Sequence, residues 1–123
     1  MKNIVHLCDC MDFMKDVPDK YYDLAIVDPP YGIGVGRMGR GKWASSMLGK
    51  SEWDSAAPPK EYFVDLYRIA RFWIAWGANY FQLPSSRGFI VWDKGAGFRG
   101  RDYAECELAF SSFDCNARVF SHD

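Results

Sequence analysis

The sequence lacks any long apolar run. No segment of its 123 residues approaches the roughly 18 apolar residues that are needed to cross a membrane. Its first residues also lack the charged and then apolar pattern of a secretory signal peptide. These two absences predict a cytoplasmic protein with no membrane partner. The length predicts a single domain, residues 1–123, built around one hydrophobic core.

Paired cysteine motifs are also lacking. The four cysteines form no Cys-x-x-Cys pair, and His6 and His122 do not complete the set of about four ligands that a zinc ion needs. We therefore expect no metal site. We expect reduced thiols, buried or half-buried, at all four cysteine positions. These positions are Cys8, Cys10, Cys106 and Cys115.

Acidic residues are lacking in one part of the chain, although the net charge of the whole chain is only -1. Residues 1–28 hold six acids against three bases, whereas residues 32–50 hold four bases and no acid. The net charge alone predicts neither a nucleic-acid nor a membrane partner. Segment 32–57 is glycine-rich and shows no hydrophobic periodicity, so we predict a flexible basic loop. Its bases are Arg37, Arg40, Lys42 and Lys50.

Hydrophobic periodicity predicts strands that alternate with helices. A helix is expected from residue 10, capped by Asp9 and ended by Pro18, and a second helix after Pro58 and Pro59. The second helix is expected to carry an apolar stripe of Tyr62, Phe63, Leu66, Ile69 and Ala70. The nearly continuous apolar run at 21–28 is typical of a strand covered on both faces. We expect further strands at 4–7, 72–77, 87–94 and 104–113, and core positions for Trp73, Trp76 and Trp92.

This alternation predicts an α/β fold whose ligand site lies at the carboxyl ends of the strands. Three apolar runs end in polar residues, at Asp28, at residues 77–79 and at residues 93–94. If the strands are parallel, these three ends meet along one edge of the sheet. Asp93 and Lys94 are expected to form an ion pair there. Asn79 and Tyr80 either line the pocket or form a short capped turn.

The tetrapeptide Asp-Pro-Pro-Tyr stands at the first of these strand ends. Asp28 is a hydrogen-bond acceptor when ionised, and Pro29 and Pro30 offer only carbonyl oxygens because proline has no N–H. Tyr31 supplies a flat aromatic face. Such a site suits a planar ring that carries an NH₂ group, because both amine hydrogens find acceptors while the ring stacks. The same acceptors stabilise the positive charge that develops when the nitrogen is alkylated.

The segment "VDPPYGIGV" resembles motif IV of the amino-methyltransferases, which methylate adenine N6 or cytosine N4 in DNA. "SEWDSAAPPKEYFVDLYRIAR", "WGANYF", "IVWDKGAG" and "ECELAFSSF" resemble successive segments of the prophage-type adenine-specific enzymes. The resemblance implies a partial Rossmann-like sheet, mostly parallel, with flanking helices. The chain would supply the catalytic portion, from motif IV to motif VIII. It also implies that Asp28, Pro29 and Pro30 hold the target amine while Tyr31 stacks on the base.

The resemblance further implies S-adenosylmethionine as the methyl donor and double-stranded DNA as the partner. The segment that ends in Cys8 and Asp9 resembles the "GD" segment near the adenosine of the cofactor, with Cys8 in place of the usual glycine. The expected cofactor-binding residues are therefore Cys8, Asp9 and Asp28. The target base must be flipped out of the duplex. Either the basic loop helps by contacting phosphates, or it is merely solvated chain. Its expected DNA-binding residues are Arg37, Arg40, Lys42, Trp43 and Lys50.

The glycine-rich cofactor loop of this family is lacking. We therefore interpret the chain as a catalytic half that is inactive alone and that self-associates or pairs with a cofactor-binding half. An aspartate rather than a serine at position 28 favours adenine N6 over cytosine N4. Two other hypotheses stay open. One is methylation of a glutamine side-chain amide, whose family usually has asparagine at this position. The other is a remnant that folds and binds DNA without turnover.

Overall fold

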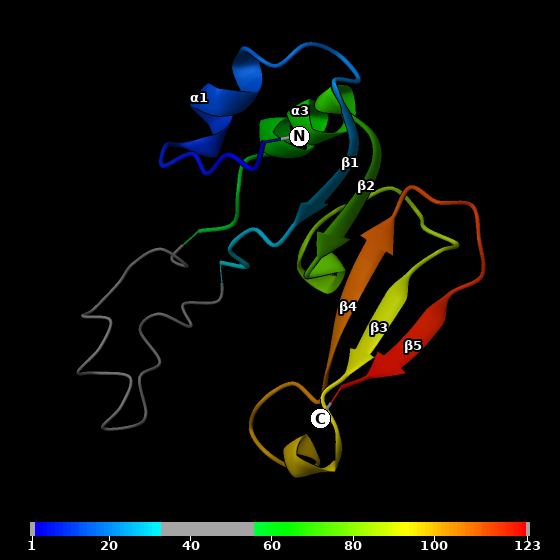
Figure 1. The fold of residues 1–123 in the computed structure, drawn as a ribbon. Helices are drawn as coiled ribbons and strands as arrows, with labels where there is room; N and C mark the ends of the chain where they lie inside the picture. Colours follow the sequence, from blue (N-terminus) through cyan, green and yellow to red (C-terminus); the bar gives the residue numbers. More distant parts are fainter. Residues whose placement is uncertain (1, 33–55, 123) are drawn as a thin grey trace.

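The computed structural model describes residues 2–32 and 56–122. These residues form two helices and five strands, together with two short 3₁₀ turns (Figure 1). In chain order the elements are α1 (Cys10–Lys15), β1 (Tyr22–Val27), α3 (Lys60–Ile69), β2 (Ala70–Trp76), η2 (Ala78–Tyr80), β3 (Ile90–Asp93), η3 (Ala96–Phe98), β4 (Cys106–Ser111) and β5 (Arg118–Ser121).

The five strands form one mixed sheet in the order β1-β2-β4-β3-β5. β1 runs parallel to β2, and β3 runs parallel to β5. β4 lies between β2 and β3 and is antiparallel to both. Four of the five strands therefore point the same way, which confirms the predicted α/β fold with a mostly parallel sheet. It also brings the carboxyl ends of β1, β2 and β3 to one end of the sheet.

Both helices begin where the sequence predicts, and α1 ends at Lys15, before Pro18. Asp9 caps α1, since its Oδ1 accepts a hydrogen bond of 2.8 Å from the backbone N–H of Met11. Pro59 stands directly before α3. Proline fits at a helix start because the N–H group that it lacks would have no partner within the helix there. The apolar stripe of α3 is buried as expected. Its residues are Tyr62, Phe63, Leu66 and Ile69.

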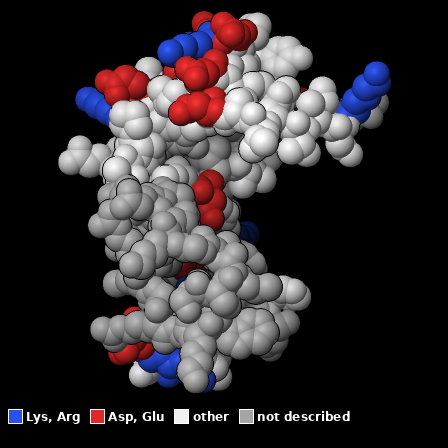
Figure 2. Space-filling model, turned by 90° about the vertical axis from the view of Figure 1, so that its left-hand side faces the viewer, with Lys and Arg blue, Asp and Glu red and all other residues white. Residues whose placement is uncertain are grey.

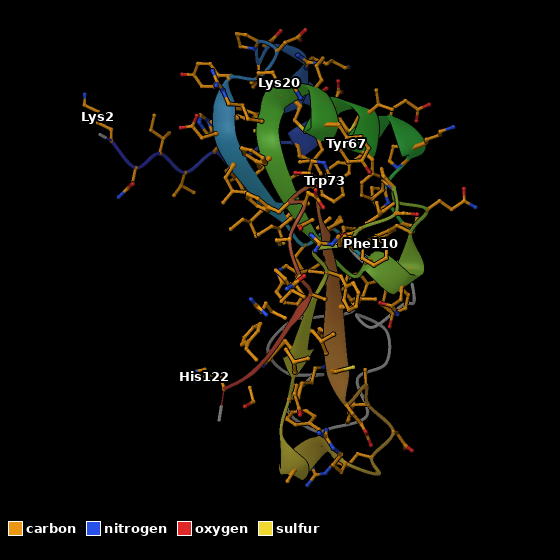
Figure 3. The ribbon with its side chains drawn as sticks, turned by 90° about the vertical axis from the view of Figure 1, so that its right-hand side faces the viewer. Lys2, Lys20, Tyr67, Trp73, Phe110 and His122 are labelled. Carbon is orange, nitrogen blue, oxygen red and sulfur yellow. The ribbon has the colours of Figure 1, made fainter. Side chains whose placement is uncertain are left out.

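The hydrophobic core lies between these two helices and one face of the β1–β2 pair. Trp73 and Ala75 of β2 are buried in it, and Trp73 packs against Tyr67 of α3 with ring centroids 5.0 Å apart (Figure 3). Arg68 ties α3 to the end of α1 through hydrogen bonds of 2.6 Å to the carbonyl of Val17 and 2.7 Å to that of Met14. The helices therefore hold β1 and β2 firmly in place, and the site described below depends on these two strands.

The expectation that β1 is covered on both faces is wrong for the part of the chain that the structure describes. Leu24 and Ile26 point away from the helices and are 43% and 62% exposed. Phe72, their neighbour on β2, is 45% exposed and stacks on Phe113 at a centroid distance of 4.7 Å. Among the described elements both helices lie on the other face, so this apolar face has no helix of its own.

A strand at residues 4–7 is also a wrong prediction. Ile4, Val5 and Leu7 are 69%, 96% and 104% exposed, and they pair with no strand among the described residues. Alternating apolar residues form a strand only where a neighbouring edge accepts their backbone hydrogen bonds. β1 is the outermost strand of the sheet, and its outer edge pairs with none of the described segments.

We expect the chain to self-associate through β1, because an open apolar edge next to an open apolar face favours pairing with a second copy. Ile26→Lys should shift the chain toward a monomer, since it places a charge beside that edge. Val64→Lys is the matched control, because Val64 is 58% exposed on α3, away from the edge. Sedimentation velocity measures both variants. A monomeric wild-type chain would contradict the prediction.

Two further differences from the sequence-based expectations concern small features. The strand β5 was not predicted, since its four residues are all exposed and show no alternation. All four cysteines are exposed rather than buried or half-buried. The described residues hold no group of three or more side chains able to bind a metal ion, and no helix among them is long and apolar enough to cross a membrane.

Candidate functional site

The candidate site lies where β1 and β2 end. The two strands are parallel neighbours in register, so Asp28 follows β1 beside the turn that follows β2. The ring of Tyr31 stacks on Tyr80 of that turn, with centroids 4.5 Å apart and planes 16° from parallel. Phe81 meets Tyr31 edge-on at 6.1 Å. The structure thus joins two of the three strand ends that the sequence placed together, and it makes Tyr80 part of their junction.

The side chains of Asp28 and Tyr31 are hydrogen-bonded to each other. The hydroxyl of Tyr31 donates a hydrogen bond of 2.8 Å to Oδ1 of Asp28. Burial, and then this bond and the charge of Asp28, raise the pKa of Tyr31 well above its ordinary range. Tyr31 therefore stays protonated at neutral pH and acts as a donor, which fixes one carboxylate oxygen and leaves Asp28 acceptor capacity for a substrate.

Gly77 makes this arrangement sterically feasible. Its φ of +76° is in the left-handed region that favours glycine. A Cβ at this position would lie 2.2 Å from Cε1 of Tyr31, so the ring lies directly against the bare backbone. The N–H of Gly77 donates a hydrogen bond of 2.9 Å to the carbonyl of Leu108 in β4, which anchors the turn to the sheet. From the sequence, Gly77 was expected only as the end of a strand.

A pocket of about 440 Å³ opens beside Asp28. Its walls come from the start of α1, the end of β1 and the start of α3. The lining residues are Asp9, Cys10, Met11, Val27, Asp28, Pro29, Pro30, Pro58, Pro59 and Tyr62. This size is ordinary for a small-molecule site, and the mixture of apolar walls with a few polar groups is typical of one.

The polar groups of the pocket are mainly acceptors. Asp9 and Asp28 bring carboxylates, and the prolines bring carbonyl oxygens without competing N–H groups. Burial chiefly, and then the charges of Cys10 and Asp28, raise the pKa of Tyr62 to about 12. Tyr62 thus remains a neutral phenol that can donate one hydrogen bond. The sequence placed Tyr62 in the core stripe of α3, and no local motif distinguishes it from its neighbours there.

The third strand end belongs to β3, which β4 separates from β2, and it forms other ion pairs than expected. Asp93 pairs with Arg99, whose Nη2 lies 2.8 Å from Oδ1, and does not pair with Lys94. Nζ of Lys94 instead lies 2.6 Å from Oε1 of Glu107, and both side chains are largely buried. The predicted Asp93–Lys94 pair is therefore wrong. Neighbouring residues at the end of a strand point to opposite faces, so each finds its partner on a different side.

The Lys94–Glu107 pair belongs to the surroundings of the site. Its ammonium group lies 5.9 Å from the ring centroid of Trp92 and 5.6 Å from that of Phe98. After burial and Asp28, the charge of Glu107 contributes to the raised pKa of Tyr31. The sequence does not predict this pair. Its residues lie 13 positions apart and meet only because β3 and β4 are antiparallel partners.

These positions bring most of the predicted site together. Asp9, Asp28, Pro29 and Pro30 line one pocket, and Tyr31 adjoins it through Asp28. Cys8 is exposed and is not among the lining residues. The predicted DNA-binding residues of the basic loop lie outside the residues that the structure describes. They are Arg37, Arg40, Lys42, Trp43 and Lys50.

A known methyltransferase resembles this chain. The similarity is to the type II methyltransferase M1.MboII of Moraxella bovis, with 32% identity over 66 residues. The matched residues are 54% of this chain and only 20% of that enzyme, so the chain spans about a fifth of its relative. No family model matches the chain. The similarity supports a methyltransferase relationship.

Proposed function

We propose that this chain carries the catalytic part of an S-adenosylmethionine-dependent DNA methyltransferase that acts on N6 of a flipped adenine. The observation that carries the proposal is the Asp28–Tyr31 segment at the carboxyl end of β1. There a carboxylate and two prolines, which have no N–H donor, line a pocket. The hydroxyl of a neighbouring tyrosine donates a hydrogen bond to the carboxylate. The similarity to a type II methyltransferase supports the methyl-transfer chemistry.

The site suits an exocyclic amine for an electronic reason. The lone pair of such a nitrogen is delocalised into the ring, so the amine is a poor nucleophile. Asp28 and a proline carbonyl accept its two hydrogens and favour the pyramidal nitrogen, whose lone pair is localised. The negative charge of Asp28 then stabilises the positive charge that grows on nitrogen as the N–C bond forms and the methyl–sulfur bond of the donor breaks. The proton that is released afterwards has Asp28 and solvent as acceptors.

The methyl donor fits the residues at the pocket only in part. Asp9 and Asp28 supply carboxylates suited to the hydroxyl and amine groups of S-adenosylmethionine, and Met11 and Val27 supply apolar wall. When bound, this molecule supplies an electrophilic methyl group. The chain holds no glycine-rich loop of the family type, so we assign it the adenosine end of the cofactor site and no more.

The charge distribution limits where DNA binds. Acidic side chains gather at the end of the molecule that carries α1 (Figure 2). Asp12 lies in α1 and Asp19 shortly after it, with side chains 77% and 79% exposed, and they pair with Lys15 and Arg68. A surface rich in acids disfavours phosphates, so we expect the duplex to approach from another side. The acid-free segment 32–50 is the chain's richest source of positive charge for that contact.

Neutralising the four cations of the basic loop should weaken binding to every DNA sequence alike. Each lost phosphate contact lowers the slope of log K against log salt by about 1, because fewer counterions are released. The variant replaces Arg37, Arg40, Lys42 and Lys50 by glutamine, and fluorescence anisotropy at several salt concentrations measures the slope. Four substitutions at Lys2, Lys15, Lys60 and Arg71 make the control of equal charge. An unchanged slope in the loop variant would leave the loop without a DNA role.

The proposed function is tested by tritium transfer from labelled S-adenosylmethionine, followed by nucleoside analysis of the product. Detection of N6-methyladenine in DNA that has been incubated with the whole protein would support the proposal. N4-methylcytosine would move the substrate to the other base, and label in a glutamine-containing peptide would move it to a protein. Binding to DNA with no label in any product would leave the chain as a DNA-binding protein without turnover.

A further inference from the structure

Tyr80 holds a position that the motif at the end of β1 does not explain. It belongs to the turn after β2, yet its ring lies almost parallel to that of Tyr31 at 4.5 Å. It is 38% exposed, so it is not a core residue. Among the described rings that contact Tyr31, Tyr80 is the one that lies face to face with it, whereas Phe81 meets it edge-on.

Tyr80 and Gly77 act together as a shelf for Tyr31. The N–H of Tyr80 donates a hydrogen bond of 2.9 Å to the carbonyl of Gly77, and residues three apart in a 3₁₀ turn lie on the same side of it. The bare α-carbon of Gly77 already lies against the Tyr31 ring. The turn thus supports Tyr31 with backbone at one point and with an aromatic ring at the next.

The shelf fixes the direction of the Tyr31 hydroxyl. The side chain of a tyrosine rotates about two bonds, and Tyr31 follows the end of β1, so it lies outside the sheet. Contact with Gly77 and Tyr80 restricts both torsions and leaves the hydroxyl 2.8 Å from Oδ1 of Asp28. The orientation of the Asp28 carboxylate therefore depends on Tyr80, which lies 52 positions away and reaches Asp28 through the ring of Tyr31.

We propose that Tyr80 is a positioning residue of the transfer reaction, which acts through Tyr31 to orient the Asp28 carboxylate toward the target amine. This inference rests on the proposed function. Substrate then stacks on the face of Tyr31 turned away from Tyr80, so that two tyrosines and the base form three layers. Tyr31 has two tasks, to stack on the base and to hold one oxygen of Asp28, and Tyr80 secures the second.

The test compares Tyr80→Leu, which removes the ring, with Tyr80→Phe, which keeps it. Tyr80→Leu should lower kcat on the order of tenfold while KM changes little, since misorientation of a reacting group affects the transition state more than binding. Tyr80→Phe should retain the wild-type kcat. Tyr103→Leu is the matched control, because Tyr103 is 68% exposed on the loop before β4.

A double-mutant cycle shows whether the effect passes through Tyr31. In a Tyr31→Phe background, which keeps the ring and removes the hydroxyl, Tyr80→Leu should cost little more. An undiminished additional loss in that background would overturn the inference. A wild-type kcat in Tyr80→Leu would also overturn it.

A second measurement does not depend on activity. The ¹³C resonance of the Tyr31 Cζ atom, assigned with Tyr31→Phe, reports the titration of its hydroxyl. The Tyr31 pKa should fall toward the ordinary value of about 10 in Tyr80→Leu and stay raised in Tyr80→Phe. If it stays raised in both, Tyr80 does not hold the hydroxyl and the inference is wrong. A wild-type protein that transfers no methyl group counts against the proposed function, while this titration still decides whether Tyr80 positions Tyr31.

Discussion

Asp28→Ala is expected to abolish methyl transfer while the fold stays intact. Removing one preorganised hydrogen-bonding group from a transition-state site typically costs about 10²–10³ in kcat. Asp28 supplies a full charge as well as an acceptor, so a loss of at least about 10³ is expected. The fold should tolerate the change, because Asp28 is exposed and, among the described residues, its side chain is held by a hydrogen bond from the hydroxyl of Tyr31. Transfer of labelled methyl groups and thermal unfolding measure the two effects.

Two further variants make this prediction specific. Asp28→Asn keeps the size of the side chain but replaces one acceptor oxygen by an NH₂ group, which repels the substrate amine; a similarly large loss is expected. Asp23→Ala removes another carboxylate from β1, whose side chain is 99% exposed and lies 3.8 Å from Arg71. It should leave turnover unchanged. Near-normal turnover in Asp28→Ala would remove Asp28 from the mechanism.

The sequence predicted those features that local chemistry decides. The Asp9 cap and the Pro58–Pro59 start of α3 follow from which residues satisfy or lack helix N–H groups. The buried stripe of α3 follows from a period of 3.6 residues. The position of Asp28 at a strand end follows from the abrupt stop of an apolar run. None of these features requires knowledge of a distant segment.

The features that the sequence missed depend on partners far along the chain. Residues 4–7 have the pattern of a strand but no strand beside them, and β5 has a partner in β3 without any alternating pattern. Lys94 meets Glu107 because β3 and β4 are antiparallel. The bond from Tyr31 to Asp28 was missed for a different reason. The sequence assigns separate roles to the Tyr31 ring and the Asp28 carboxylate, which are three residues apart. Only the structure shows that the Tyr31 hydroxyl donates a hydrogen bond to one oxygen of Asp28.

Gly77→Ala should strongly lower the free energy of unfolding, because two costs coincide there. An L-residue at a φ of +76° costs roughly 1–2 kcal/mol. The added methyl group would also lie 2.2 Å from the Tyr31 ring, and overpacking typically costs about 1–3 kcal/mol. The sum is about 2–5 kcal/mol, a large share of the roughly 5–15 kcal/mol that stabilises a domain. Tyr31 must also move, so transfer should fall with stability.

The chain offers glycines that separate the two costs. Gly100 has a φ of +69° with no neighbour within 4 Å of the added Cβ, so Gly100→Ala should show the backbone cost alone. A Cβ added at Gly88 would lie 2.6 Å from the carbonyl oxygen of Phe113, and Gly88 has no left-handed φ, so Gly88→Ala should show the steric cost alone. Gly97 has neither constraint, and Gly97→Ala should stay within about 0.5 kcal/mol of wild type. Chemical denaturation gives the free energy of unfolding for all four variants.

If Gly77→Ala were no more destabilising than Gly100→Ala, Tyr31 would not lie firmly on Gly77. The turn after β2 would then be no support for the ring that holds Asp28.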